Sequence, residues 1–233
     1  YLATSQSRPA KLLRKVYWGI QRFTLPAPRV LTRPMLWIFL TLRVSYLWLK
    51  RVFICEPLFK AYCTKFGKGV RTGSHIHWIQ GKGCIIIGDD VELDAKCHIM
   101  FAARFSPNPT LQIGDHTIIR GANLTVCRNI TIGKHCLLAM GVSILESSGH
   151  PSDPQGRLAG EPPRPDDVRP VTICDNVWIG GGSVIMPGVT VGEGSIVSMN
   201  SVVLNNVPPY TVVAGYPARK IATLQAPEVE PAA

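Results

Sequence analysis

The first 71 residues almost lack acidic side chains. Between Arg8 and Arg71 the chain holds 14 lysines and arginines against one acid, Glu56, whereas the remaining residues carry more acids than bases. A section with so large an excess of basic side chains does not have the mixed charge of an ordinary solvated surface. It favours an anionic partner, and the two classes to weigh are a membrane surface and a nucleic acid.

Long apolar runs are missing as well. The segment from Met35 to Leu49 would extend about 22 Å as a helix, short of a hydrocarbon core of about 30 Å, and Arg43 lies within it. This disfavours a transmembrane helix. No short apolar core leads to a small-residue cleavage site near the N-terminus, so we expect no secretory signal.

The cysteines and histidines also lack the spacing that is typical of a metal site. The seven cysteines are scattered, and their odd number indicates a reducing compartment rather than a disulfide framework. Among the six histidines, no three are spaced to converge on one ion. We therefore expect no metal site, and we expect structural or exposed positions for five histidines: His75, His77, His98, His116 and His135.

What the sequence does contain is a six-residue rhythm. An aliphatic side chain returns at every sixth position of the C-terminal part, at Ile173, Ile179, Ile185, Val191, Val197 and Val203. A period of six matches neither the 3.6 of a helix nor the two of a strand, but it is typical of a parallel β-helix with three flat sides per coil. The aliphatic side chains would stack inward, with glycine, asparagine and aspartate at the corners.

The same rhythm occurs earlier in the chain, with two interruptions. It runs through Ile87, Leu93, Ile99, Ile113, Ile119, Val126, Ile132, Leu138 and Ile144. Cys97 and Cys136 occupy the fifth place of their hexads and are expected in the core. The interruptions fall at residues 101–110 and 146–170. Because loops that leave a rigid solenoid often carry chemistry, residues 146–170 are the first place to expect an active site.

Three segments follow from these patterns. Residues 1–70 are predicted to form a basic, amphipathic, helical region that associates with a membrane. Residues 71–221 are predicted to form an all-β solenoid domain with loops at 101–110 and 146–170. Residues 222–233 are predicted to form a C-terminal tail.

The N-terminal extension is best interpreted as a monotopic anchor. Residues 11–22 project as a helix with basic side chains on one side and apolar side chains opposite. Such a helix would lie among lipid headgroups, so we expect residues 8–71 to bind an anionic membrane surface, which places the protein in the cytoplasm, peripheral on the inner face of the plasma membrane. The apolar faces argue against a nucleic-acid partner. The alternative is a helical pair packed on the solenoid or on a neighbouring subunit.

His150 is the one histidine in a position that favours catalysis. It stands where the regular coil gives way to the long loop, and Pro151 after it restricts its backbone to extended conformations. A neutral imidazole can accept the proton of an attacking hydroxyl, an effect of about 10²–10⁴-fold. Backbone amides at solenoid corners could stabilise the oxyanion. Glu146 is expected to be a solvated loop acid rather than a group that orients the imidazole.

Four motifs in order resemble those of one family. They cover residues 148–154, 171–180, 187–192 and 207–219. Their sequence and spacing resemble the hexapeptide-repeat acetyltransferases, and most closely the maltose and galactoside acetyltransferases and those of capsule and colanic-acid biosynthesis. The resemblance covers roughly residues 85 to 221.

The resemblance implies a left-handed β-helix, a homotrimer with active sites between subunits, and transfer of an acetyl group from acetyl-CoA to a hydroxyl. It makes His150 the general base and Asn123 the residue that positions the acceptor. It assigns the cofactor-binding residues as Trp178 from an adjacent subunit, Gly181, Ser198 and Met199 along the pantetheine tunnel, and Arg219 and Lys220 near the CoA phosphates. Met199 replaces a residue that is usually small, and Gly181 replaces a common serine.

The acceptor expected is a sugar or lipid-linked glycan at the membrane face, as in polysaccharide biosynthesis. The residues leave other functions open. These are transfer of a longer acyl chain to a lipid or amine, a zinc enzyme like the gamma-type carbonic anhydrases, and a non-catalytic membrane assembly module.

Overall fold

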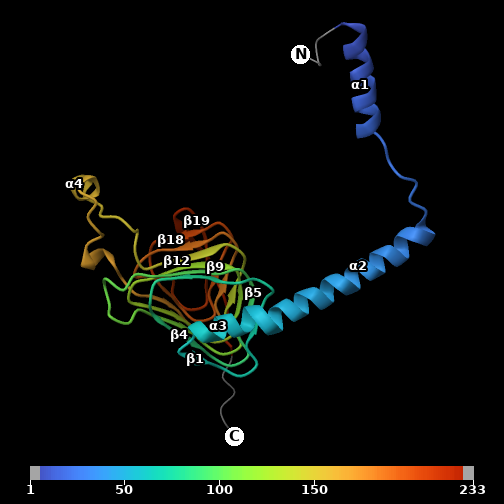
Figure 1. Ribbon diagram of the computed structural model, residues 1–233. Coiled ribbons are helices and arrows are strands. Elements are labelled where there is room, and N and C mark those ends of the chain that lie inside the picture. Colours follow the sequence, from blue (N-terminus) through green and yellow to red (C-terminus); the bar gives the residue numbers. More distant parts are fainter. Residues whose placement is uncertain (1–5, 228–233) are drawn as a thin grey trace. The chain divides into compact units, whose positions relative to one another are not determined.

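The structure, a computed structural model, describes residues 6–227 and divides into two compact units, Tyr1–Tyr46 and Leu47–Ala233 (Figure 1). The first unit contains helix α1 (Arg8–Gln21) and most of helix α2 (Arg29–Lys50), which continues into the second unit. The second unit begins with the π-helical turn η1 (Arg51–Cys55) and helix α3 (Glu56–Tyr62). All the described strands lie in this second unit.

The helices α1 and α2 bury little of their apolar surface. Ala10 is the one buried residue of α1, and α2 has none. Large apolar side chains are instead exposed along both helices, among them Trp18, Trp37 and Phe39. Within residues 6–227, no helix is both long enough and apolar enough to span a bilayer.

Three parallel sheets form the sides of a solenoid, and the chain visits them in turn. Sheet A contains β1 (Lys65–Phe66), β4 (Cys84–Ile87), β7 (Thr110–Ile113), β10 (Asn129–Ile132), β13 (Val171–Ile173) and β16 (Thr190–Val191). Sheet B contains β2 (Arg71–Thr72), β5 (Glu92–Ala95), β8 (Ile118–Arg120), β11 (Leu137–Leu138), β14 (Trp178–Ile179), β17 (Ile196–Val197), β19 (Thr211–Gly215) and β20 (Ala218–Thr223). Sheet C contains β3 (Trp78–Gln80), β6 (His98–Phe101), β9 (Ala122–Val126), β12 (Val142–Leu145), β15 (Val184–Ile185) and β18 (Val202–Val203). Only the terminal pair of described strands, β19 and β20, is antiparallel.

The core is a set of aliphatic columns, as the hexads predict. On sheet A the paired positions Ile87, Ile113, Ile132, Ile173 and Val191 stack inward, each at most 2% exposed. Burying each such side chain contributes roughly 1.5–3 kcal/mol, and stacking repeats that gain on every coil. The predicted burial of Cys97 and Cys136 is confirmed, at 2% and 1% exposed.

The corners hold residues in the left-handed region of backbone space. Asp90, His116, His135, Asn176 and Asn200 have φ between 52° and 57°, a conformation that short polar side chains tolerate better than branched ones. His116 and His135 are exposed, as predicted, and their rings stack at 4.9 Å from coil to coil.

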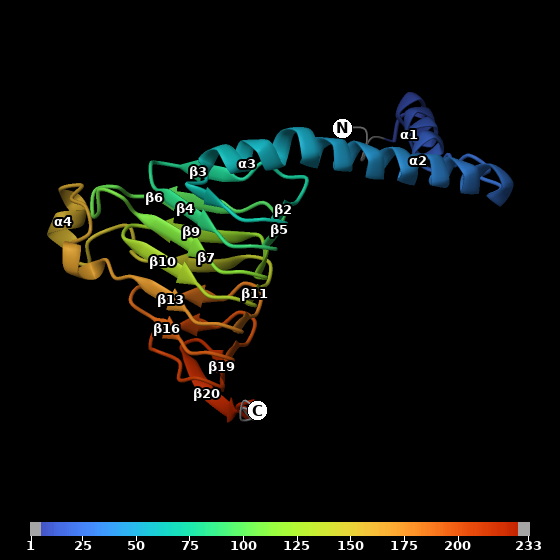
Figure 2. The same ribbon diagram turned by 90° about the horizontal axis from the view of Figure 1, so that it is seen from below.

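The first coil begins at Lys65, ahead of the expected start at residue 71. Phe66, Gly67 and Val70 repeat the pattern of an inward residue, a corner glycine and a second buried residue, but an aromatic ring replaces the aliphatic side chain. Helix α3 lies at this end of the solenoid (Figure 2), and its buried Phe59 ring lies 6.3 Å from that of Phe66. His77 is a buried structural residue here, and burial lowers its pKa to about 4.

Both interruptions of the hexads leave the solenoid at the corner between sheets C and A. One joins β6 to β7, and the other joins β12 to β13. The longer loop contains helix α4 (Pro154–Leu158) and a 3-10 turn (Pro165–Asp167), which project beside the coils (Figure 2). Asp153 caps α4 by accepting a hydrogen bond of 2.7 Å from the Gly156 amide.

Candidate active site

His150 lines a cavity of about 430 Å³ between the two loops. The shorter loop contributes Ala102, Arg104 and Phe105 to this cavity. The longer loop contributes Ser147, Gly149, His150, Gly160, Glu161, Pro162 and Pro163, and the sheet C corner adds Met100, Thr125 and Cys127. Residues far apart in sequence therefore meet at one concave site beside the predicted base.

Short-range hydrogen bonds shape the segment that presents His150. The Ser147 hydroxyl accepts a bond of 3.1 Å from the Gly149 amide, and the Ser148 hydroxyl donates one of 3.0 Å to the His150 carbonyl. Gly149 takes φ of 83°, which a residue with a side chain rarely adopts. The following Pro151 is buried, so the backbone on both sides of the exposed His150 is held.

Glu146 is not the solvated loop acid that the sequence predicted, nor is it placed to orient the imidazole. Its side chain is fully buried and accepts three backbone hydrogen bonds, from the amides of Cys127 at 2.5 Å, Arg128 at 2.7 Å and Asn129 at 2.7 Å. These charge-assisted bonds compensate the lost solvation. The Glu146 carbonyl also accepts from the Arg169 amide at 3.0 Å, so this residue holds both ends of the long loop.

The thiol that faces the cavity is unsuited to nucleophilic attack. Burial, with a smaller contribution from the Glu146 carboxylate, raises the pKa of Cys127 to about 11. The thiolate is the nucleophilic form of cysteine, and at neutral pH this thiol stays protonated. The cavity therefore favours direct transfer assisted by a base over an acyl-enzyme on cysteine.

Asn123 lines a second cavity, of about 220 Å³, on the outer face of sheet C. Its amide donates to the Ser143 hydroxyl at 3.3 Å, and its backbone pairs with His98 and Ser143 on the neighbouring coils. Met100 and Thr125 line both this cavity and that of His150. The structure thus places both predicted catalytic residues along one groove.

The predicted cofactor residues lie elsewhere on the same chain. Trp178 is about half exposed on the outer face of sheet B. Gly181, Ser198 and Met199 form the corner between sheets B and C, and the exposed Arg219 and Lys220 lie on β20. Since His150 lies at the opposite edge of sheet C, one chain does not bring the two sets together.

The corner between sheets B and C contains an exposed apolar residue, Met140, that was not among the predicted cofactor residues. Met140 precedes Gly181 by one coil, and Gly181 precedes Met199, with amide–carbonyl bonds of 3.0 and 2.9 Å linking the three corners. Both methionines are about 70% exposed. A Cβ on Gly181 would lie 3.1 Å from the Met140 carbonyl oxygen, so a side chain at this position would crowd the backbone of the coil before it. The hexads align Leu138 with Ile179, so Met140, two residues further on, could have been predicted at the position equivalent to Gly181.

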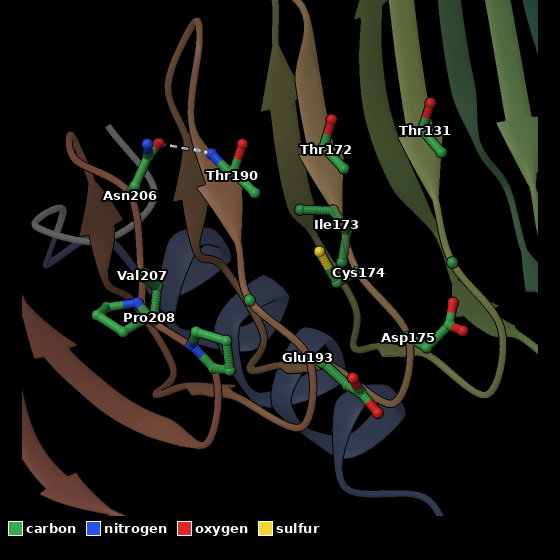
Figure 3. A pocket seen from close by; sticks show the side chains of 13 residues that line it. Thr131, Thr172, Ile173, Cys174, Asp175, Thr190, Glu193, Asn206, Val207 and Pro208 are labelled. Atoms are coloured by element: carbon green, nitrogen blue, oxygen red, sulfur yellow. Dashed lines mark hydrogen bonds between the residues drawn. The ribbon is translucent and has the colours of Figure 1, made fainter.

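The outer faces of sheets A and B differ in polarity. On sheet A, Thr131, Thr172 and Thr190 pair in register along an open groove of about 650 Å³, and the Asn206 side chain accepts from the Thr190 amide (Figure 3). On sheet B, the paired outer positions are apolar for five coils: Ile118, Leu137, Trp178, Ile196 and Val212. Continuous apolar columns on a solvent face indicate a surface that another molecule covers.

Nowhere between residues 6 and 227 do three or more histidine, cysteine or acidic side chains gather in a group that could hold a metal ion.

Comparison with known proteins agrees with the coil pattern. Residues 170–205 match the bacterial transferase hexapeptide family (six repeats), and residues 111–146 match the hexapeptide repeat of succinyl-transferase. A crystal structure of a hexapeptide-repeat-containing acetyltransferase from Vibrio cholerae is 30% identical, covering 73% of this chain and 80% of that one, with a TM-score of 0.51. The chain belongs to the hexapeptide-repeat acetyltransferases. Its parallel sheets and this likeness together fit the left-handed β-helix predicted above.

Curated relatives of this hexapeptide-repeat acetyltransferase match over shorter stretches. Galactoside O-acetyltransferase of Escherichia coli is 39% identical over 119 residues, which are 50% of this chain and 56% of that protein. Nodulation protein L of Rhizobium meliloti is 44% identical over 90 residues, 39% of this chain and 46% of that protein. The chain spans about half the length of the curated relatives it matches.

Proposed function

We propose that this hexapeptide-repeat acetyltransferase moves an acetyl group from acetyl-CoA to a hydroxyl of a sugar or lipid-linked glycan, with His150 as general base. The observation that carries the proposal is the groove on sheet C, where the cavities of His150 and Asn123 adjoin through Met100 and Thr125. An acceptor that lies on Asn123 can present its hydroxyl toward the imidazole.

The residues supply a balanced reaction. His150 takes the hydroxyl proton while the acceptor oxygen bonds to the thioester carbon, and the proton passes to the CoA sulfur as the carbon–sulfur bond breaks. The exposed methionines Met140 and Met199 flank Gly181 and offer an apolar channel to the pantetheine arm. Arg219 and Lys220 offer positive charge to the CoA phosphates.

The direct test uses labelled acetyl-CoA and an extract of membrane lipids. The proposal requires label to enter a hydroxyl-bearing glycan or glycolipid, which mass spectrometry of the product would identify. Transfer of label to an amine, or no transfer at all, would contradict the proposed reaction.

A homotrimer follows from the same proposal. Three copies packed through the apolar columns of sheet B would cover Trp178 and set it beside the sheet C groove of a neighbour, completing the site. Leu137→Glu should therefore dissociate the trimer into monomers, because it places three charges in an apolar interface. Sedimentation velocity measures the change. Thr131→Glu, on the polar face of sheet A, is the matched control and should leave the trimer intact.

Residues 8–71 are proposed to hold the enzyme on the inner face of the plasma membrane. The exposed apolar side chains of α1 and α2 and the nearby basic residues support this. Full-length protein should float with vesicles containing anionic lipid and should detach as salt is raised, because salt screens the attraction.

Lys11→Glu with Lys15→Glu should weaken flotation at least tenfold, since each lysine near the surface contributes about 1 kcal/mol. The control pair, Lys82→Glu with Arg120→Glu, lies on the solenoid and should float like the wild type. Equal flotation of the two double variants would contradict an electrostatic anchor.

A further inference from the structure

Trp78 is an exposed aromatic side chain on the first strand of sheet C, at the end of the groove remote from His150. It is 53% exposed and lines the same cavity as Asn123. The ammonium group of Lys96 lies 5.6 Å from the centroid of its ring. An indole beside an open cavity, with a cation held against it, combines a flat apolar surface with a positive charge.

The cavity that Trp78 lines shares two lining residues with the cavity of the predicted base. Trp78 pairs with His98 on the next coil, and His98 pairs with Asn123 on the coil after that. Adjacent strands are about 4.8 Å apart, so Trp78 lies about 10 Å from Asn123 along the solenoid. Met100 and Thr125 then lead into the cavity of His150. An acceptor with a hydroxyl at His150 therefore reaches Trp78 only if it extends beyond a single small group.

The charges along this groove favour an anion at its far end. Lys96 lies against the Trp78 ring, beside the cavity rather than among its lining residues, and Arg104 and Glu161 both line the His150 cavity. The remaining polar lining of the second cavity is neutral amide and hydroxyl from Gln80, Asn123 and Thr125, together with His98. The Trp78 end thus carries a cation with no acidic side chain among the cavity's lining residues.

We propose that Trp78 and Lys96 form an acceptor subsite that binds a glycosyl phosphate, with the sugar against the exposed part of the indole and the phosphate at the Lys96 ammonium. The subsite rests on the proposed acetyl transfer and names its substrate class. An indole face suits the apolar side of a sugar ring, and lysine binds phosphate as a point charge. The same chemistry occurs in a free sugar phosphate and in a sugar phosphate attached to a lipid.

Binding to the full-length protein tests the subsite without catalysis. Isothermal titration with glucose 1-phosphate and with methyl glucoside should show the phosphate probe binding at least about tenfold tighter. Lys96→Met should remove that difference, and Trp78→Ala should weaken both probes by about tenfold. Lys82→Met, an exposed lysine outside the groove, is the matched control and should retain the wild-type values. Absence of glucose 1-phosphate binding, or an unchanged preference in Lys96→Met, would overturn the subsite.

Kinetics with labelled acetyl-CoA separates the subsite from the proposed reaction. With glucose 1-phosphate as acceptor, Trp78→Ala and Lys96→Met should raise KM about tenfold and leave kcat within about twofold, because neither touches the reacting atoms. A fall in kcat with unchanged KM would overturn the subsite. Preferential binding of the phosphate probe without acetyl transfer would support the subsite and contradict the proposed reaction instead.

A third experiment distinguishes a free sugar phosphate from one attached to a lipid. The same sugar phosphate attached to a polyprenyl chain is offered in phosphatidylcholine vesicles beside the free probe. A lower KM for the lipid-linked probe, lost in Trp78→Ala, supports the subsite with a membrane-borne acceptor. A lower KM for the free probe, lost in the same variant, supports it with a soluble one.

Discussion

Replacing His150 by alanine is expected to lower kcat for acetyl transfer by about two orders of magnitude or more. The variant removes the group proposed to take the hydroxyl proton, and an alcohol is a poor nucleophile without that assistance. The affinity for CoA should stay near the wild-type value, because the proposed CoA residues lie at the other edge of sheet C and on sheet B. Steady-state kinetics with labelled acetyl-CoA and equilibrium titration with CoA measure the two quantities.

The fold itself should survive this change. His150 is exposed, and the bonds that shape its segment come from Ser147 and Ser148 rather than from the imidazole. The melting temperature should therefore stay within a few degrees of the wild-type value. His75→Ala removes another exposed histidine, outside the groove, and should leave kcat unchanged. Near-normal turnover in the His150 variant would remove this residue from the mechanism.

The solenoid could be predicted because each coil places aliphatic side chains at the same inward positions. Ile173, Ile179 and Ile185 each face inward on a different side, and the next coil repeats them, so six-residue spacing alone specifies the stack. The two loops could also be predicted, since residues that interrupt the six-residue period cannot stack on the neighbouring coils. The first coil was not, because Phe66 fills its inward position with an aromatic ring.

The candidate site was predictable only where local sequence determines it. His150 was found because Pro151 and the start of the loop lie next to it in the chain. Glu146 was assigned wrongly because its partners are amides 17 to 19 residues earlier, brought close by one turn of the coil. The cavity of His150 depends on how two loops meet at one corner, and the spacing of residues in the sequence does not predict that contact.

Replacing Glu146 by glutamine should destabilise the protein by about 2–4 kcal/mol. One carboxylate oxygen accepts from two amides, and the other accepts from the Asn129 amide. A glutamine can keep one oxygen in place, but its NH₂ group then faces an N–H donor and leaves that buried amide unsatisfied. Urea unfolding followed by tryptophan fluorescence measures the loss. Glu146→Ala should cost more, because all three amides lose their partner and a cavity opens.

Glu161→Gln is the control for charge alone, since this exposed acid lies on the same loop and its replacement should change stability by no more than about 0.5 kcal/mol.

The loss of the Glu146 hydrogen bonds in Glu146→Gln should also affect catalysis. Glu146 joins the turn at Cys127 to both ends of the loop that carries His150, so loosening it displaces the base relative to Asn123. We therefore expect kcat to fall about tenfold or more even below the denaturation midpoint, because small misplacements of a catalytic group are costly. Wild-type stability in Glu146→Gln would show that the three bonds contribute little, and wild-type kcat in a destabilised variant would show that the loop positions His150 without them.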